Sequence, residues 1–180
     1  MRLSDIRFNA LRSALYHAER ERFFDSRNRW LTFFSIVFGS AAAGSLAADS
    51  PEIGIFLIVS SALTSAVSLA FDPSGNALEH AYLRRRFYEL LSDVEGLNED
   101  EDVDIKGELS ARLMLLFGEE RPHMHAVNLI AWNEAADAIH GIGVKERIKI
   151  SRWCRVTKNI LRHSGLEIKT EKAGDKNGGS

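Results

Sequence analysis

The residues best suited to chemistry in this chain are basic, and many of them lie near its C-terminal end. On a helical wheel, residues 144–163 place their Lys and Arg side chains on one half, opposed only by Glu146, and apolar residues such as Ile150 and Trp153 on the other. The basic residues are Lys145, Arg147, Lys149, Arg152, Arg155, Lys158 and Arg162. Such a face binds anionic lipid, polyphosphate or an acidic partner helix. The plainer alternative is an ordinary surface face, paired with the acidic segment 93–104.

Catalytic and metal-binding patterns are missing from the sequence. It contains no Gly-rich phosphate loop, no His-Glu-x-x-His and no Gly-x-Ser-x-Gly motif. His123 and His125 are two residues apart, so on a helix they point about 200° apart and cannot hold one metal ion from one face. They suit polar contacts near a ligand better. Cys154 is the sole cysteine and has no His partner at a suitable spacing. We therefore expect no enzyme activity, no cofactor and no metal.

Two apolar runs, 30–48 and 53–71, organise the rest of the chain. Each is nineteen residues long and free of charge, so as a helix each would span roughly 28 Å at about 1.5 Å per residue. That length matches a bilayer core of about 30 Å. The polar segment 49–52 between them contains a proline. The pattern predicts a transmembrane hairpin. The alternative is a pair of buried helices in a soluble protein, but soluble helices of small proteins usually show only one apolar stripe.

Each run carries a second pattern. In the first, bulky residues, Phe33, Phe34 and Phe38 among them, precede small ones, and Ser35, Gly39 and Ala43 repeat at a spacing of four. Small residues at this spacing permit close helix packing in lipid, within the hairpin or between subunits. The second run aligns hydroxyls on one helical face, which either bond back to the i−4 carbonyl or line a narrow wet path. These hydroxyl residues are Ser61, Thr64, Ser65 and Ser68.

Charges around the runs predict the orientation. The first 29 residues hold seven arginines against four acidic residues, and Arg84, Arg85 and Arg86 follow the second run. Since Lys and Arg near membrane ends mark the cytoplasmic side, both termini are expected there. The expected parts are an N-terminal cytosolic helix (1–29), the hairpin (30–71), a cytosolic helical domain (72–165) and a flexible tail (166–180).

The segments outside the two apolar runs are all predicted to be helical, apart from turns and the tail. The N-terminal helix should continue into the first apolar run, because no Gly or Pro separates them. A turn at 72–76 precedes a helix from Ala77 to about Gly96, and further helices are expected over 105–117, from Pro122 onward, and over 144–163. The predicted class is all-α: a two-helix transmembrane hairpin with a long N-terminal helix and a C-terminal cytosolic helical bundle.

The order of these elements resembles the SLATT family, two-transmembrane effectors linked to nucleotide-sensing bacterial antiviral systems. The resemblance covers roughly residues 5–165. It rests on a basic N-terminal helix with Tyr16-His17 and Glu19-Arg20, on the hairpin, and on the Arg-rich helix 81–91. The match is one of architecture and loose pattern, without an invariant catalytic motif.

The resemblance implies a homo-oligomer in the bacterial inner membrane. It would open an ion-conducting pore when a nucleotide or oligonucleotide, made by a partner nucleotidyltransferase, binds on the cytosolic side. Opening would depolarise the membrane in anti-phage defence. A tetramer is the expected assembly, the bilayer and the nucleotide are the expected partners, and duplex DNA is not. The main alternative is a non-conducting anchor that presents the cytosolic helices to a protein partner.

Under this hypothesis the basic and aromatic cytosolic residues would bind the anion and stack its base. The candidates are Arg112, Arg121, His123 and His125, backed by Arg147, Arg152 and Arg155, with Trp132 for stacking. Phe33, Phe34 and Phe38 could close the path by dewetting. The ion path would be lined, or the two membrane helices packed together, by Gly39, Ala43 and the hydroxyl residues of the second run.

Overall fold

The computed structural model describes residues 1–48, 50–97, 103–121, 123–140, 146–148, 150–159, 161 and 170–172. The chain is helical, as predicted, with two short strands paired antiparallel near its C-terminal end. Its elements in order are α1 (Leu3–Ala47), α2 (Pro51–Phe71), α3 (Pro73–Glu95), α4 (Val103–Glu119), α5 (His125–His140), β1 (Glu146–Ile148), α6 (Arg152–Thr157) and β2 (Thr170–Lys172).

The chain divides into two compact units. Unit 1 comprises Met1–Arg20 and His80–Ser180, and unit 2 comprises Glu21–Glu79. Helix α1 runs without a break from Leu3 to Ala47 and so contributes its first part to unit 1 and its remainder to unit 2. The unbroken helix follows from the absence of Gly or Pro before residue 39.

The main core of unit 1 lies between α1, α3 and α4. Leu3, Ile6, Ala10 and Ala14 recur along one face of α1 and are buried against apolar residues of the other two helices. Phe87 and Leu90 of α3 and Leu113 of α4 are fully buried there. Spacings of three and four residues place such side chains on one helical stripe, which explains why each of these helices has a single buried face.

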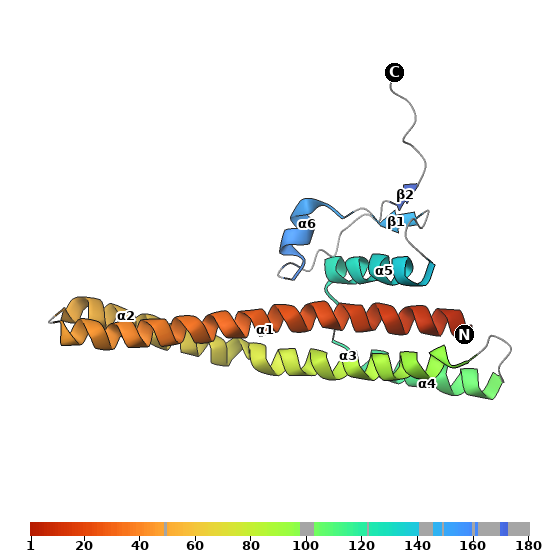
Figure 1. Cartoon of the computed structure of the whole chain (residues 1–180), viewed down its shortest axis with the longest axis horizontal. Coiled ribbons are helices and arrows are strands. Elements are labelled where there is room, and N and C mark those ends of the chain that lie inside the picture. The colour runs from red at the N-terminus through yellow and green to blue at the C-terminus, as the bar shows by residue number, and fades with distance from the viewer. Residues whose placement is uncertain are drawn as a thin grey trace, which may run out of the picture. The chain divides into compact units, whose positions relative to one another are not determined.

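Helix α5 covers the opposite side of the same part of α1 (Figure 1). Tyr16 packs with Val127 and Ala131 in a second, smaller cluster. The rings of Phe8 and Trp132 meet edge to face, with their centroids 5.7 Å apart. The first five turns of α1 are therefore enclosed from two sides and form the central element of unit 1.

Unit 2 is an antiparallel pair formed by the rest of α1 and α2. Ser61 donates a hydrogen bond of 3.1 Å to the backbone carbonyl of Ser35, and the hydroxyls of Ser35 and Ser65 lie 2.9 Å apart. Near the other end, a Cβ added to Gly54 would lie 3.1 Å from the side chain of Leu46. Small residues therefore let the two backbones come close together, as helices do in lipid.

Helix α3 begins earlier than predicted, at Pro73 rather than near Ala77. Asp72 ends α2 in the left-handed conformation, with φ of 37°, and its Oδ1 accepts the backbone N–H of Gly75 at 3.0 Å. This is an N-cap bond for α3, and proline is well suited to the first helical position because its missing N–H has no partner there anyway. The turn-forming residues thus sit inside the first turn of a helix.

The C-terminal segment contains a second correction. The single helix predicted over 144–163 is wrong: β1 occupies 146–148, and α6 covers only 152–157. Asn133 of α5 explains the strand, because its Nδ2 donates to the carbonyl of Ile148 and its Oδ1 accepts the N–H of Ile148, both at 3.0 Å. These bonds hold Ile148 extended. Residues 170–172, expected in the tail, pair with 146–148 as β2.

The boundaries of α4 and α5 complete the fold. Helix α4 extends the predicted 105–117 by two residues at each end. Helix α5 begins at His125, three residues after Pro122, which itself lies outside the described residues.

Candidate functional site

A cluster of buried polar side chains lies inside unit 1, with His17 of α1 at its centre. His17 is only 1 % exposed. Its Nδ1 lies 2.7 Å from Nδ1 of His80, and its Nε2 lies 3.1 Å from Oε1 of Glu120. The second oxygen of Glu120 lies 2.7 Å from Nε2 of His123. We call these four residues the His–Glu cluster.

Proton positions in the cluster follow from donor and acceptor chemistry. A carboxylate oxygen only accepts, so both His17 and His123 donate to Glu120. The contact between the Nδ1 atoms of His17 and His80 then holds one proton between two rings. The result is a hydrogen-bonded chain from α3 through α1 to the end of α4, in which each bond polarises the next.

The pKa values in the cluster shift with burial and with these bonds. Burial by itself would raise the pKa of Glu120, but hydrogen bonds from His123 and His17 outweigh it and lower the pKa to about 2. Burial, together with the nearby charges of His17, Arg20 and Arg121, lowers the pKa of His80 to about 3. At neutral pH the cluster therefore combines a charged Glu120 with a neutral His80.

Aromatic rings hold the cluster in place. The ring of His17 stacks on Phe87 of the core, with centroids 5.7 Å apart and planes at 14°. Tyr16 packs against His123 at 4.8 Å, and its hydroxyl accepts the N–H of Met124 at 3.0 Å. Burial raises the pKa of Tyr16. Neighbouring residues of one helix turn thus contact α3 and the segment leading into α5.

The next turn of α1 holds the end of α6. The carboxylate of Glu19 lies 2.7 Å from the ammonium of Lys158. Arg20, only 9 % exposed, donates to both the backbone and the side-chain oxygen of Asn159, at 3.1 and 3.0 Å. Burial lowers the pKa of Arg20. Tyr16-His17 and Glu19-Arg20, the residues of the family resemblance, therefore all form contacts between elements distant in the sequence.

The arrangement suits coupling better than covalent chemistry. Among the described residues, no group of three or more His, Cys, Asp or Glu side chains could hold a metal ion. The cluster joins α1, α3, the end of α4 and the segment before α5 through charged and hydrogen-bonded groups. Removing one partner from such a buried network leaves another uncompensated, which is costly. A change at one helix would therefore be transmitted to the others.

The proposed ligand residues do not form one site. His123 lies in the His–Glu cluster, and Arg121 is exposed beside it, whereas His125 is exposed at the start of α5. Arg112 forms an ion pair of 2.7 Å with Asp93 on the surface of α3 and α4. Trp132 is engaged in packing α5 on α1 and is only partly exposed.

The basic residues of the C-terminal segment lie apart from these. Arg152 and Arg155 are exposed on α6, beside Trp153 and Val156, whose side chains are 67 % and 77 % exposed. The side chain of Arg147 lies outside the described residues. Helix α6 therefore presents a mixed basic and apolar surface, shorter than the one that the helical wheel predicted.

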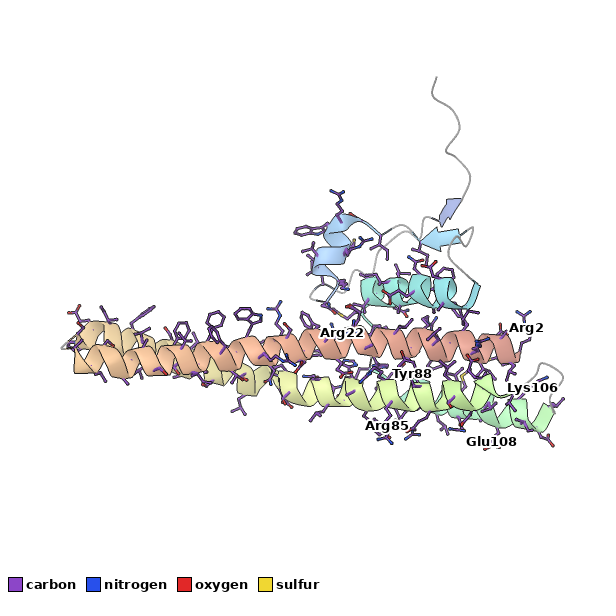
Figure 2. The ribbon with its side chains drawn as sticks, in the orientation of Figure 1. Arg2, Arg22, Arg85, Tyr88, Lys106 and Glu108 are labelled. Carbon is purple, nitrogen blue, oxygen red and sulfur yellow. The ribbon has the colours of Figure 1, made fainter. Side chains whose placement is uncertain are left out.

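The three consecutive arginines of α3 also separate. Arg85 points away from α1 and bonds Glu89 at 2.9 Å (Figure 2). Arg86 donates to the hydroxyl of Tyr82 at 2.6 Å and lies over its ring. The Nε of Arg84 is buried. At least two of the three are held by side chains of their own helix.

The proposed gate residues belong to an exposed aromatic row on α1. The rings of Trp30, Phe34 and Phe38 stack at four-residue spacing, with centroids 5.7 and 5.8 Å apart. Phe33 meets Trp30 and Phe34 edge to face. More than 40 % of the surface is exposed in each of Trp30, Phe33 and Phe34. These rings therefore pack against one another and do not belong to a core.

The hydroxyl residues of α2 divide between two roles. Ser61 and Ser65 bond across to Ser35 of α1, as described above. Thr64 bonds back to the carbonyl of Ser60 at 2.8 Å. Of the remaining candidates, Gly39 faces Ser61, whose Oγ would lie 3.7 Å from an added Cβ. Ala43 is exposed, and Ser68 lines a groove that is described below.

One helical stretch in the described part of the chain, Pro51–Glu95, is long and apolar enough to cross a membrane. Only 6 % of its apolar window is buried inside the chain, so this window is not part of the core, unlike the end of α3. The chain matches no protein-family model, no curated protein and no solved structure.

The His–Glu cluster is the feature that sequence reasoning missed. His17 and His80 are 63 residues apart, and His17 and Glu120 are 103 apart, so no local motif joins them. The one available signal was a polar residue, His17, adjacent to the apolar stripe of α1.

Proposed function

We propose that this protein is a homo-oligomeric membrane effector that forms an ion-conducting pore opened by a nucleotide or oligonucleotide on the cytosolic side. Unit 2 spans the bacterial inner membrane, and both termini lie in the cytoplasm. The exposed apolar surface of unit 2 carries the proposal. The resemblance to SLATT effectors supports the nucleotide signal and a role in anti-phage defence.

The surface of unit 2 favours lipid over water. On α2, Ile55, Phe56 and Leu63 are 61, 70 and 64 % exposed, and α1 adds its aromatic row. A continuous exposed apolar surface marks a membrane or protein interface. Helix α1 brings an uncharged run of nineteen residues alongside α2, and a helix pair satisfies its own backbone bonds within the bilayer.

A pore requires several copies of unit 2. Two helices packed directly on each other leave no room for an enclosed channel, so the channel wall must come from neighbouring chains. Exposed small residues on α1, Ala43 among them, would let copies pack closely. A tetramer is the assembly that we propose.

The His–Glu cluster is suited to transmit ligand binding. A nucleotide phosphate bound at Arg121 and His123 would compete with Glu120 for the proton donated by His123. Loss of that bond would loosen the link between α1, α3 and the start of α5. Because α1 continues from unit 1 into unit 2, a shift of its first part would reach the aromatic row.

Helix α6 favours a second candidate, a non-conducting anchor that docks a partner. Trp153 and Val156 are exposed next to Arg152 and Arg155. Aromatic and Arg side chains are enriched at the centres of protein interfaces. In that case unit 2 would hold the protein at the membrane and α6 would bind an acidic, partly apolar surface.

Ion flux separates the two candidates. The purified full-length protein is placed in liposomes, and flux is measured with and without a panel of cyclic and linear oligonucleotides. We expect flux only with one ligand. Arg121→Gln should abolish the response while leaving the oligomer intact, and the matched surface variant Arg85→Gln should respond normally.

Each other outcome has a definite meaning. Flux without any ligand would contradict nucleotide gating and favour a holin-like lysis protein. No flux from a well-folded oligomer under any condition would contradict the pore and leave the anchor. Loss of the oligomer in Arg121→Gln would show that Arg121 is structural.

A further inference from the structure

Unit 2 carries a groove in which hydroxyl groups and a carboxylate lie among apolar side chains. The groove has a volume of about 660 Å³ and is lined by residues of both helices. Thr32 and Ser35 of α1 face Ser65 and Ser68 of α2 across it, and Asp72 lies where α2 ends. Leu31, Ile36 and Leu69 complete the lining, so four hydroxyls and one carboxylate share this depression with three apolar side chains.

Lipid is a poor occupant for this groove. Elsewhere the helix pair presents bare apolar side chains, such as Val37 of α1 and Phe56 and Val59 of α2. Polar and charged groups within a membrane helix are costly and usually face a water-filled cavity or another protein chain. The hydroxyls and the carboxylate of the groove favour water as its occupant, whereas the wholly apolar surfaces favour lipid.

The groove is held by defined contacts. The 2.9 Å bond between the hydroxyls of Ser35 and Ser65 ties its two walls together. Asp72 is fixed at its end because the backbone there is left-handed and Oδ1 accepts the N–H of Gly75. The carboxylate is therefore positioned at the groove by the junction of two helices and does not depend on a flexible loop.

We infer that the grooves of neighbouring copies face a shared axis and line the ion path, and that Asp72 makes this path selective for cations. This inference rests on the proposed function. A ring of carboxylates attracts cations and repels anions, and hydroxyl oxygens replace part of a cation's hydration shell. Copies related by symmetry place the same residue at the same depth, so one Asp72 per chain forms such a ring.

The first test is the ion selectivity of the pore. Reversal potentials are measured in bilayers with a KCl gradient, under the condition that opens the flux. We expect K⁺ to be preferred over Cl⁻ in the native protein. Asp72→Asn should lower the K⁺/Cl⁻ permeability ratio by at least about fivefold, which is the effect of a single unit charge acting on one ion at about 4 Å in water. Asn keeps the N-cap bond, so the fold of the junction is preserved.

Glu52→Gln is the matched control. It removes an acidic residue from the first turn of α2, at the opposite end of the helix from Asp72, and should leave the ratio unchanged. An anion-selective native pore, or equal effects of the two variants, would overturn the inference while leaving a conducting pore in place.

The second test measures water access directly. With Cys154 replaced by Ser, Ser68→Cys should react with a charged, water-soluble thiol reagent in liposomes. Ala66→Cys, on an exposed part of α2 outside the groove lining, should not react, because a charged reagent does not enter lipid. Reaction at position 66 but not at position 68 would overturn the inference even where flux is normal.

The two tests distinguish the failure of this inference from the failure of the proposed function. Flux with an unselective path or an unreactive Ser68→Cys contradicts the groove alone. Absence of flux under all conditions contradicts the pore, and the selectivity of the groove with it.

Discussion

Unit 1 and unit 2 share helix α1, but the apolar side chains of this helix are buried in unit 1 and largely exposed in unit 2. In unit 1, Ile6 and Ala10 are fully buried in the core that α1 forms with α3 and α4. In unit 2, Trp30, Phe33 and Ile36 of the same helix remain 52–63 % exposed. Helix α1 continues unbroken through the change, but its sequence passes from a charged segment over 1–29 to an uncharged run over 30–48, so both the sequence and what covers the helix differ.

Polar groups show the reverse distribution. Unit 1 buries the charged and hydrogen-bonded His–Glu cluster within an apolar core, where each member has a partner. In the described part of unit 2, the hydrogen bonds between its two helices come from hydroxyls and a carbonyl of Ser35, Ser61 and Ser65. A protein core can fix charged groups by pairing them, whereas a helix pair in lipid is best joined by small, weakly polar side chains. This difference is the one that the proposed membrane location of unit 2 requires.

The strongest test of this comparison removes one leucine from each unit. Leu90 of α3 is fully buried beside Ile6 and Leu113, so Leu90→Ala should lower the free energy of unfolding by about 2–5 kcal/mol. Leu63 of α2 is 64 % exposed, so Leu63→Ala leaves no cavity and should have little effect. Denaturant unfolding of the full-length protein in a mild detergent, followed by circular dichroism, measures both.

An equal decrease in the free energy of unfolding for Leu90→Ala and Leu63→Ala would contradict the comparison. Leu63 would then be packed inside an assembly as firmly as Leu90 is packed inside the chain. A cross-linking assay on the same samples would identify that assembly.

A smaller effect is expected from acid, and it should be confined to unit 1. Burial lowers the pKa of His80 to about 3, from its ordinary value of 6.5. As the pH falls below 6.5, the unfolded chain takes up a proton at His80 that the folded chain does not, so folding stability decreases. Protonation of Glu120 adds to the loss below 4.5, because its folded pKa is about 2. The unfolding temperature should drop by several degrees between pH 6.5 and about pH 5.

His80→Gln and His125→Gln separate this effect from general acid sensitivity. Gln at position 80 cannot be protonated, so the decrease above pH 4.5 should become shallower. His125 is exposed at the start of α5, and its replacement should leave the profile unchanged. The same profile in His80→Gln as in the native protein would mean that another group senses the acid.

Local sequence patterns predicted the helices well where each helix follows its own periodicity. The single helix from Leu3 to Ala47 and the helix over 103–119 follow from apolar spacing and from the positions of Gly and Pro. The start of α3 was misplaced because Pro and Asp favour turns and helix starts alike. Only the bond from Asp72 to Gly75 distinguishes the two.

Long-range contacts account for what the sequence could not predict. A strong amphipathic wheel suggested a helix over 144–163, but two bonds from Asn133, fifteen residues away, hold Ile148 extended. The His–Glu cluster likewise joins residues from three separate segments, α1, α3 and the connection between α4 and α5. Residue type alone grouped Arg112 and Arg121 with His123 and His125 as one ligand site, yet it does not show that Arg112 is already paired with Asp93.

Arg112 supplies the smallest expected effect. It lies 2.7 Å from Asp93, and the two side chains are 43 % and 50 % exposed. Exposed ion pairs contribute about 0–1 kcal/mol and weaken with salt, so Arg112→Ala should lower the free energy of unfolding by less than about 1 kcal/mol. Asp93→Ala should lower the free energy of unfolding by about the same amount, and the double variant by no more than either, as a double-mutant cycle would measure.

Ligand-dependent flux should persist in all three variants, because this pair joins α3 to α4 on the surface and is separate from the His–Glu cluster. Loss of the ligand response in Arg112→Ala but not in Asp93→Ala would instead mean that Arg112 leaves Asp93 to bind the ligand, and that unit 1 recognises its signal on this outer surface.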